Sequence, residues 1–159
     1  DAACKRICSW RKFGALKTGK KFAFFSLHFD HKGKTARAES AKLLVKKASE
    51  ISGNLPFLCV GDFNATPDSE PMKIIFAAKS FKDSLSVLRG APESAGGTFH
   101  NFTGAPKRDR IDYIFVSEGV GVLSYAVIRD SVADLGLPAN PKAAYPSDHF
   151  PVAVDAVLE

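Results

Sequence analysis

The sequence predicts an α/β (α+β) domain, with a mixed β-sheet flanked by helices. Strand-like and helix-like stretches alternate through the first half of the chain, and strand-like stretches dominate the second half. That order is typical of a sheet with mixed strand directions. With 159 residues, of which 45% are hydrophobic and 25% charged, the chain is long enough to bury one core. Residues 1–159 are therefore expected to form a single domain.

The first half begins with an expected strand and a long helix. The Phe-rich strand at 20–29 follows a "KTGK" turn. The helix is expected at 35–52, and Gly53 is expected to end it. The apolar residues that recur on one face of this helix are Ala38, Ala41, Leu44, Val45, Ala48 and Ile51.

The apolar run "LPFLCVGDF" at 55–63 predicts a second strand, which leads into a short helix at 69–80. Ser69 is the expected N-cap of that helix, with Pro71 in its first turn. The Pro-rich stretch 132–149 is expected to be a loop. Further strands are expected at 84–88, 97–102, 110–117, 122–130 and 149–158.

Charge is unevenly distributed along the chain, whose net charge is +5. Residues 1–50 hold 13 Lys or Arg and 4 Asp or Glu, whereas residues 51–159 hold 9 and 13. The basic part could attract a phosphate-bearing substrate, although many of its lysines are expected on solvated helix and turn surfaces. Charge alone therefore does not identify a ligand.

Composition also argues against several other classes of protein. No apolar run approaches the roughly 20 residues that a membrane-spanning helix needs, and the first residues lack the apolar region of a signal peptide. Because the chain begins with Asp, we expect a processed product or a fragment. Cys4, Cys8 and Cys59 are too few and too unevenly spaced to predict a disulfide framework or a cysteine metal site.

Polar residues of the kinds that carry chemistry cluster where the expected strands end. They are His28, Asp30, Asp62, Asn64, Asp112, Asp148 and His149. Taken singly, most of them are more often turn, cap or surface residues. Asp112 is different, because it lies between Ile111 and Tyr113 and a buried carboxylate needs a partner. In α/β proteins, loops at strand ends commonly form the functional site.

Four motifs appear in order over about residues 20–158: "SLHFDH", "GDFNATPDSEP", "RIDYIFVS" and "YPSDHFPVAVDAVL". Together they resemble the endonuclease/exonuclease/phosphatase superfamily, which includes deoxyribonucleases, abasic-site endonucleases, sphingomyelinases and inositol 5-phosphatases. The helix "KTARAESAKLL" resembles the bacterial secreted or periplasmic branch.

The resemblance implies catalytic roles for five residues. Asp62 would orient or deprotonate the attacking water, and Asn64 would position that water and bond a phosphate oxygen. His149 would stabilise the charge of the transition state, with Asp112 holding its imidazole ring. His28 would contact the scissile phosphate.

The same resemblance implies that Asp148 helps to bind a divalent cation, Mg²⁺ or Mn²⁺. Arg37 is a further candidate phosphate contact, and a solvated arginine on a helix surface is the alternative for it. Substrates that fit the family are phosphate esters: nucleic acid, a sugar phosphate or a phospholipid head group.

The family fold is a four-layer α/β/β/α sandwich, and this chain resembles its C-terminal half. The motifs that supply an Asn and a metal-binding Glu in the other half are absent from the sequence, and Ser26 stands where many members have Asn. A half-sandwich would expose the Phe-rich face of its sheet, so we expect a homodimer that covers this face.

The leading hypothesis is a divalent-metal-dependent phosphoesterase. This chain is expected to contain only part of its catalytic domain. The alternative is a non-catalytic binding or assembly module that retains the fold. A carboxylate-based glycosidase would explain neither Asn64 nor the adjacent Asp148 and His149. A module that had lost its chemistry would be expected to lose these strand-end residues first, which favours the enzyme.

Overall fold

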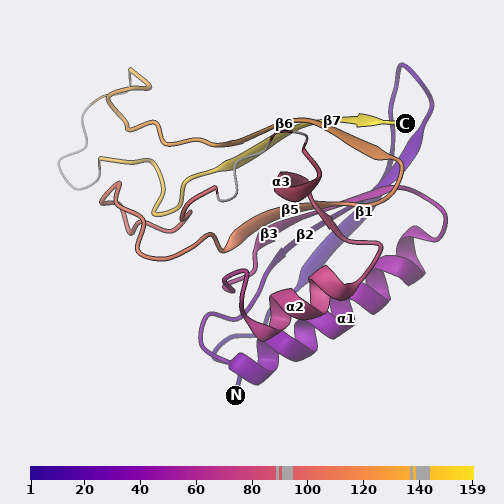
Figure 1. The fold of residues 1–159 in the computed structure, drawn as a ribbon, viewed down its shortest axis with the longest axis horizontal. Helices are drawn as coiled ribbons and strands as arrows, with labels where there is room; N and C mark the ends of the chain where they lie inside the picture. The colour runs from indigo at the N-terminus through magenta and orange to yellow at the C-terminus, as the bar shows by residue number, and fades with distance from the viewer. Residues whose placement is uncertain (89, 91–94, 137, 139–143) are drawn as a thin grey trace.

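The computed structural model describes residues 1–88, 90, 95–136, 138 and 144–159. Its elements are β1 (Cys8–Gly14), β2 (Lys21–His28), α1 (Lys34–Ser52), β3 (Phe57–Asp62), α2 (Glu70–Ala77), β4 (Lys82–Asp83), α3 (Ser84–Val87), β5 (Asp112–Val116), β6 (Val120–Val127) and β7 (Val152–Leu158). The prediction of an α/β fold with a mixed sheet flanked by helices is confirmed (Figure 1).

The five-stranded sheet has the order β1-β2-β3-β5-β4. Strands β2 and β3 are parallel, and the remaining pairs in this sheet are antiparallel. Helices α1 and α2 cover one face, and the two-stranded sheet β6–β7 lies across the other face (Figure 1). The described part of the chain contains no helix that is both long enough and apolar enough to cross a membrane.

The register of the central strands brings the predicted polar residues together. His28 pairs with Asp62 across β2 and β3, and Asp62 pairs with Asp112 across β3 and β5. Because β5 runs antiparallel to β3, its first residue lies beside the last residue of β3. Three polar side chains from distant parts of the sequence therefore stand in one row at one edge of the sheet.

The core lies between the sheet and the helices α1 and α2. Along β2, Ala23, Phe25 and Leu27 are buried on this face, as strand alternation requires. Phe63, which follows β3, is fully buried and contacts three aromatic rings edge-on: those of Phe29, Tyr113 and Phe115. This packing holds the end of β3 in place.

Helix α1 confirms the predicted apolar face. Ala38, Ala41, Leu44 and Ala48 are buried, and Val45 and Ile51 pack against the core. Gly53 ends the helix in a left-handed conformation, and its N–H donates to Ser49 O.

Helix α2 begins after Ser69, as predicted, but the Ser69 hydroxyl does not cap it. That hydroxyl donates instead to Thr66 O at 2.6 Å, within the loop that precedes the helix.

Two predicted strands were wrong, and one strand was not predicted. The expected strand at 84–88 is mostly helix α3, because the Asp83 carboxylate accepts from Leu85 N and caps a helical turn. The expected strand at 97–102 forms one isolated bridge, between Phe99 and His149. Strand β1 was not predicted, because all seven of its residues are exposed and it is held by pairing with β2.

Candidate active site

The site is built around Asp62, the last residue of β3. Gly61 precedes it with φ 151°, and a Cβ atom at Gly61 would lie 2.0 Å from Leu27 O. Only glycine allows β3 to approach β2 this closely at the strand end. Position 61 therefore requires glycine, because the close approach of β3 to β2 at this point places Asp62 at the strand end.

Asp62 and Asn64 form a tight polar turn. The Asn64 N–H donates to Asp62 Oδ1 at 2.7 Å, and the Asn64 side-chain amide donates to Asp62 Oδ2 at 3.3 Å. The same amide group donates to Phe29 O at 3.1 Å, which ties the turn to the end of β2. Asn64 has φ 46°, a left-handed conformation that asparagine tolerates better than most residues.

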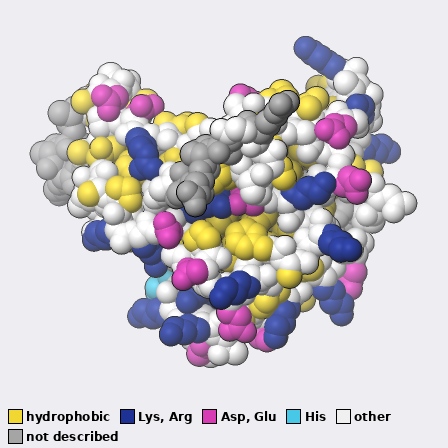
Figure 2. Space-filling model, in the orientation of Figure 1, with side chains coloured by type: hydrophobic (Ala, Val, Ile, Leu, Met, Phe, Trp, Pro, Cys, Tyr) yellow, Lys and Arg dark blue, Asp and Glu magenta, His cyan; other side chains and the backbone are white. Residues whose placement is uncertain are grey.

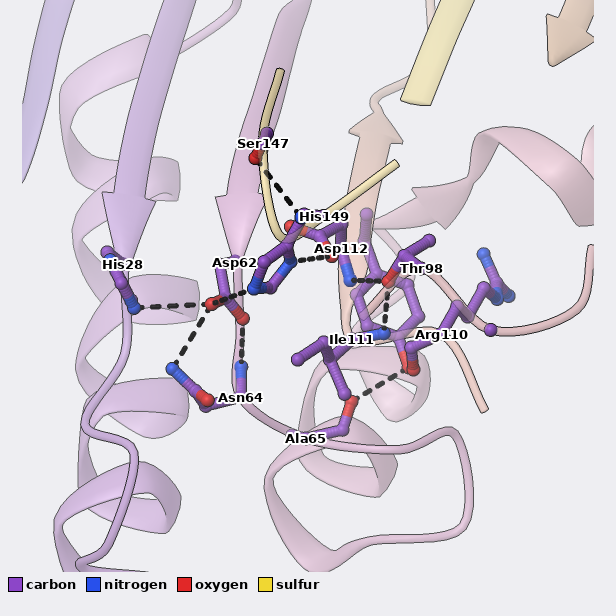
Figure 3. Close-up of polar contacts among 12 residues, drawn as sticks. His28, Asp62, Asn64, Ala65, Thr98, Arg110, Ile111, Asp112, Ser147 and His149 are labelled. Carbon is purple, nitrogen blue, oxygen red and sulfur yellow. Dashed lines mark hydrogen bonds and ion pairs between the residues drawn. The ribbon is translucent and has the colours of Figure 1, made fainter. Parts of the chain in front are cut away.

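Two histidines approach the Asp62 carboxylate from opposite sides (Figure 3). His28 Nε2 lies 3.2 Å from Asp62 Oδ2, and His149 Nε2 lies 3.9 Å from the same oxygen. Burial raises the pKa of Asp62 above its ordinary value, and the Asn64 N–H opposes that shift. Asp62 is thus more basic than an exposed aspartate.

Asp112 and His149 form a second polar pair. His149 Nδ1 lies 2.8 Å from Asp112 Oδ2, and both side chains are mostly buried. This contact with the carboxylate raises the pKa of His149 above its ordinary value. It also directs Nε2 of the ring toward Asp62 (Figure 3).

The segment 97–110 holds the two members of this pair in place. The Thr98 hydroxyl accepts from Ile111 N at 3.1 Å and from Asp112 N at 3.3 Å. The Phe99 ring lies 5.1 Å from the His149 ring, centroid to centroid. Thr98 and Phe99 were not predicted, because nothing in "GGTFHN" marks them as neighbours of a distant strand end.

Behind the site, a buried ion pair supports the start of β5. Arg110 Nη1 lies 3.0 Å from Asp83 Oδ1, and Arg110 Nη2 contacts Asp83 Oδ2. The Arg110 guanidinium also lies 4.6 Å from the centre of the Tyr113 ring. The Tyr113 hydroxyl is within hydrogen-bond distance of Ala65 O and Arg110 O.

Three other predicted polar residues lie outside this central group. Arg37 donates from Nη1 to Asp30 O at 2.9 Å. The Asp30 carboxylate is buried and accepts four backbone N–H bonds, which lower its pKa and give it a structural role. Asp148 is half-buried, and its carbonyl oxygen accepts from His100 N and Asn101 N.

Two groups among the described residues have ligand atoms close enough together for a metal ion. Asp62, Asp112 and His149 offer ligand atoms within 4.8 Å of one another, as do Cys4, Asp30 and His31. The first group fits a hard cation, because it provides two carboxylates. The second does not, because both Asp30 oxygens already accept two N–H bonds each. Asp148 belongs to neither group.

The fold and the site define an α/β protein with two acidic strand ends and a paired histidine. A model of the endonuclease/exonuclease/phosphatase family matches residues 10–149, and the chain belongs to this family. Among the curated protein sequences, no match was found.

Solved structures of this family are similar over nearly the whole chain. A mannosyl-6-phosphatase of Bacteroides thetaiotaomicron is 38% identical, with a TM-score of 0.87, over 99% of this chain and 59% of its own. A family protein of Bacteroides vulgatus is 35% identical, with a TM-score of 0.80, over 100% of this chain and 58% of its own. The chain therefore spans less than two thirds of these relatives.

The fold is shared more widely. The catalytic domain of human Nocturnin, determined with a bound sulfate anion, is 20% identical with a TM-score of 0.72. The match covers 97% of this chain and 53% of the Nocturnin chain. At this identity the likeness concerns the fold alone.

Proposed function

We propose that this chain carries the catalytic residues of a divalent-metal-dependent phosphoesterase. The observation that carries the proposal is the convergence of Asp62, Asp112 and His149, whose ligand atoms lie within 4.8 Å of one another. Membership of the endonuclease/exonuclease/phosphatase family supports the same reaction class. The chain spans less than two thirds of the length of these relatives. The activity of the whole protein is therefore also a proposal.

In the proposed reaction, a water oxygen bonds to phosphorus and the ester P–O bond breaks. Asp62 accepts the proton of the attacking water, and its raised pKa suits it to act as a base. The Asn64 side chain positions that water and bonds a phosphate oxygen. His28, whose Nε2 lies 3.2 Å from Asp62, contacts the same phosphate.

His149 stabilises the negative charge that spreads over the phosphoryl oxygens. Asp112 holds the proton on Nδ1, so Nε2 faces the reacting group with a fixed orientation. The raised pKa of His149 favours the protonated, charge-stabilising form of the ring.

We propose Mg²⁺ or Mn²⁺ as the cofactor. Asp112 would hold the ion with a carboxylate oxygen, and Asp148 is proposed as a further ligand from the adjoining loop. When bound, a divalent cation supplies electrostatic stabilisation of the phosphoryl oxygens. Arg37 and His28 are proposed to bind phosphate groups of the substrate, and His28 contacts the one that is hydrolysed.

The substrate class is a phosphate ester. The similarity to a mannosyl-6-phosphatase favours a sugar phosphate over nucleic acid or a phospholipid head group. The test is hydrolysis of mannose 6-phosphate and of bis-p-nitrophenyl phosphate, with Mg²⁺ or EDTA, by this chain and by any longer product of its gene.

The variant His149→Ala should lose nearly all activity in this assay. The matched control is His31→Ala, because His31 is an exposed histidine that contacts the Arg6 side chain, away from Asp62. Equal activity of the two variants would contradict the proposed role of His149. Phosphate binding without turnover in any form of the protein would favour the non-catalytic module.

We also propose that a symmetric homodimer covers the part of the sheet face opposite the helices that β6–β7 leaves open. Phe13 is 47% exposed there, and Phe22 and Phe24 are half-buried beside a hollow of about 540 Å³ that reaches β6–β7. Apolar surface of this kind favours association. Sedimentation analysis should give a dimer at micromolar concentration, and a well-folded monomer would contradict it.

A further inference from the structure

A second cavity adjoins the catalytic group on the far side of Asn64. Its volume is about 260 Å³, and it lies between the start of α1, the loop before α2 and Arg108. The residues that line it include Lys34, Arg37, Asn64, Glu70 and Arg108. His28, Asp62, Asp112 and His149 are not among them, so the cavity is a neighbour of the catalytic group and not part of it.

The charge of this cavity is predominantly positive. Lys34, Arg37 and Arg108 contribute three cations, against one carboxylate from Glu70. Within the described part of the chain, none of these three cations has a carboxylate within 4 Å. Figure 2 shows Lys and Arg side chains gathered at the lower left of the molecule, where α1 begins. Three cations beside one carboxylate leave a net positive charge in the cavity, and this charge favours the binding of an anion.

Two of the cations contact groups that adjoin the site. Arg37 is anchored by the bond from its Nη1 to Asp30 O, at 2.9 Å. The Arg108 guanidinium lies 5.4 Å from the centre of the Phe99 ring, and Phe99 packs in turn on His149. The cavity and the catalytic histidine therefore share one supporting ring.

The backbone of the Arg108 segment is equally constrained. A Cβ atom at Gly97 would lie 2.0 Å from Arg108 O, so this position requires glycine. The N–H of Lys107 donates to Phe99 O at 3.0 Å, which closes the loop that carries Arg108. The backbone position of Arg108 is therefore set by contacts within this loop.

Asn64 connects the two sites. Its amide group donates to Asp62 and to Phe29 O, and the same residue lines the cavity. A phosphate at Asp62 and a second anion in the cavity would thus lie on either side of one side chain.

We propose that the cavity binds a second phosphate group of the substrate, a few atoms from the one that is hydrolysed. The preferred substrates are then phosphate esters with two phosphate groups, and Arg108 selects them. This inference rests on the proposed phosphoesterase function and names its substrate class. A sugar bisphosphate and the neighbouring phosphate of a nucleic acid share this chemistry.

The test measures binding by calorimetry in metal-free buffer, so it does not depend on turnover. The probes are methylphosphonate and alkane bisphosphonates of increasing chain length. The bisphosphonate of best length should bind about tenfold more tightly than methylphosphonate, the gain typical of a charged hydrogen bond. A hexose bisphosphate and a 5′-phosphorylated dinucleotide, measured in the same way, distinguish the two natural sources.

Arg108→Gln should remove most of the bisphosphonate advantage and leave the affinity for methylphosphonate unchanged. Lys17→Gln, which removes an exposed cation from the turn before β2, is the matched control and should change neither. If Arg108→Gln behaves like Lys17→Gln with every bisphosphonate, the inference is wrong.

The two proposals can fail separately. If Arg108→Gln weakens bisphosphonate binding but Asp62→Asn and His149→Ala leave methylphosphonate binding unchanged, the cavity binds an anion and the proposed catalytic site is wrong. If His149→Ala abolishes hydrolysis while Arg108→Gln has no effect on binding, the phosphoesterase stands and the second subsite is wrong.

Discussion

Asp112 Oδ2 lies 2.8 Å from Nδ1 of His149, although the two residues are 37 positions apart in the sequence. The pair fixes the tautomer and orientation of the ring, and through them the position of Nε2 near Asp62. Its strength has consequences for both activity and stability.

Asp112→Asn should lower phosphoesterase activity by about 100-fold or more, because the ring loses its orienting carboxylate. Stability should also respond to pH. The fold raises the pKa of His149, so its contribution is fully present below about pH 6.5 and is lost as the pH rises through the raised pKa.

Urea unfolding should therefore show a larger destabilisation by Asp112→Asn at about pH 5.5 than at about pH 9.5, by about 1 kcal/mol. Asp155→Asn is a suitable control, because Asp155 accepts from the Ser124 hydroxyl and pairs with no histidine in the described part of the chain. A pH-independent loss would show that the carboxylate matters only for packing.

Asp62→Asn should abolish activity and yet stabilise the fold in metal-free buffer. Burial raises the pKa of Asp62, so the native state binds its proton more tightly than the unfolded state does. Wild-type stability therefore falls as the pH rises from about 4 through the raised pKa. The variant should gain about 1 kcal/mol at neutral pH and nothing below about pH 3.

Asp68→Asn should change the stability in the opposite direction. The Thr66 hydroxyl lowers the pKa of this exposed carboxylate, so its removal should destabilise slightly at neutral pH. Thermal unfolding of the two variants over the same pH series measures the sign of each stability change. A destabilised Asp62→Asn at pH 7 would mean that its contacts with the histidines outweigh its burial.

Arg110→Met should cost about 3 to 5 kcal/mol of unfolding free energy, because Asp83 would remain buried without its partner. The double variant Arg110→Met with Asp83→Leu should recover most of that loss, since it buries no charge. Chemical denaturation of the single and double variants measures both. If the double variant is as unstable as the single one, the loss of stability comes from lost packing and not from an unpaired charge.

Gly61→Ala should destabilise the protein by more than about 3 kcal/mol, because its Cβ atom would collide with Leu27 O at a positive φ. Gly14→Ala is the matched substitution, since nothing lies within 4 Å of a Cβ atom there. Thermal unfolding of both variants should show a loss confined to Gly61→Ala. Similar melting temperatures would indicate that β3 can shift without cost.

Local patterns in the sequence were sufficient for the main elements of the sheet–helix core. The spacing from Ala38 to Ile51 predicted helix α1, and Gly53 ends it, because such periodicity and capping act within a few residues. The exposed strand β1 carries no such pattern, since it is held by hydrogen bonds to β2. Helix α3 was misread because its cap, Asp83, also depends on a distant arginine.

The sequence by itself determined which polar residues end the strands, and its motifs indicated the family before any geometry was known. Only the tertiary structure decided that His28, Asp62 and Asp112 share one row, because strand register is set by pairing between distant segments. The same holds for Thr98, Phe99 and Arg108. Their positions beside the site come from loop contacts that no local pattern encodes, since each contact joins residues far apart in the chain.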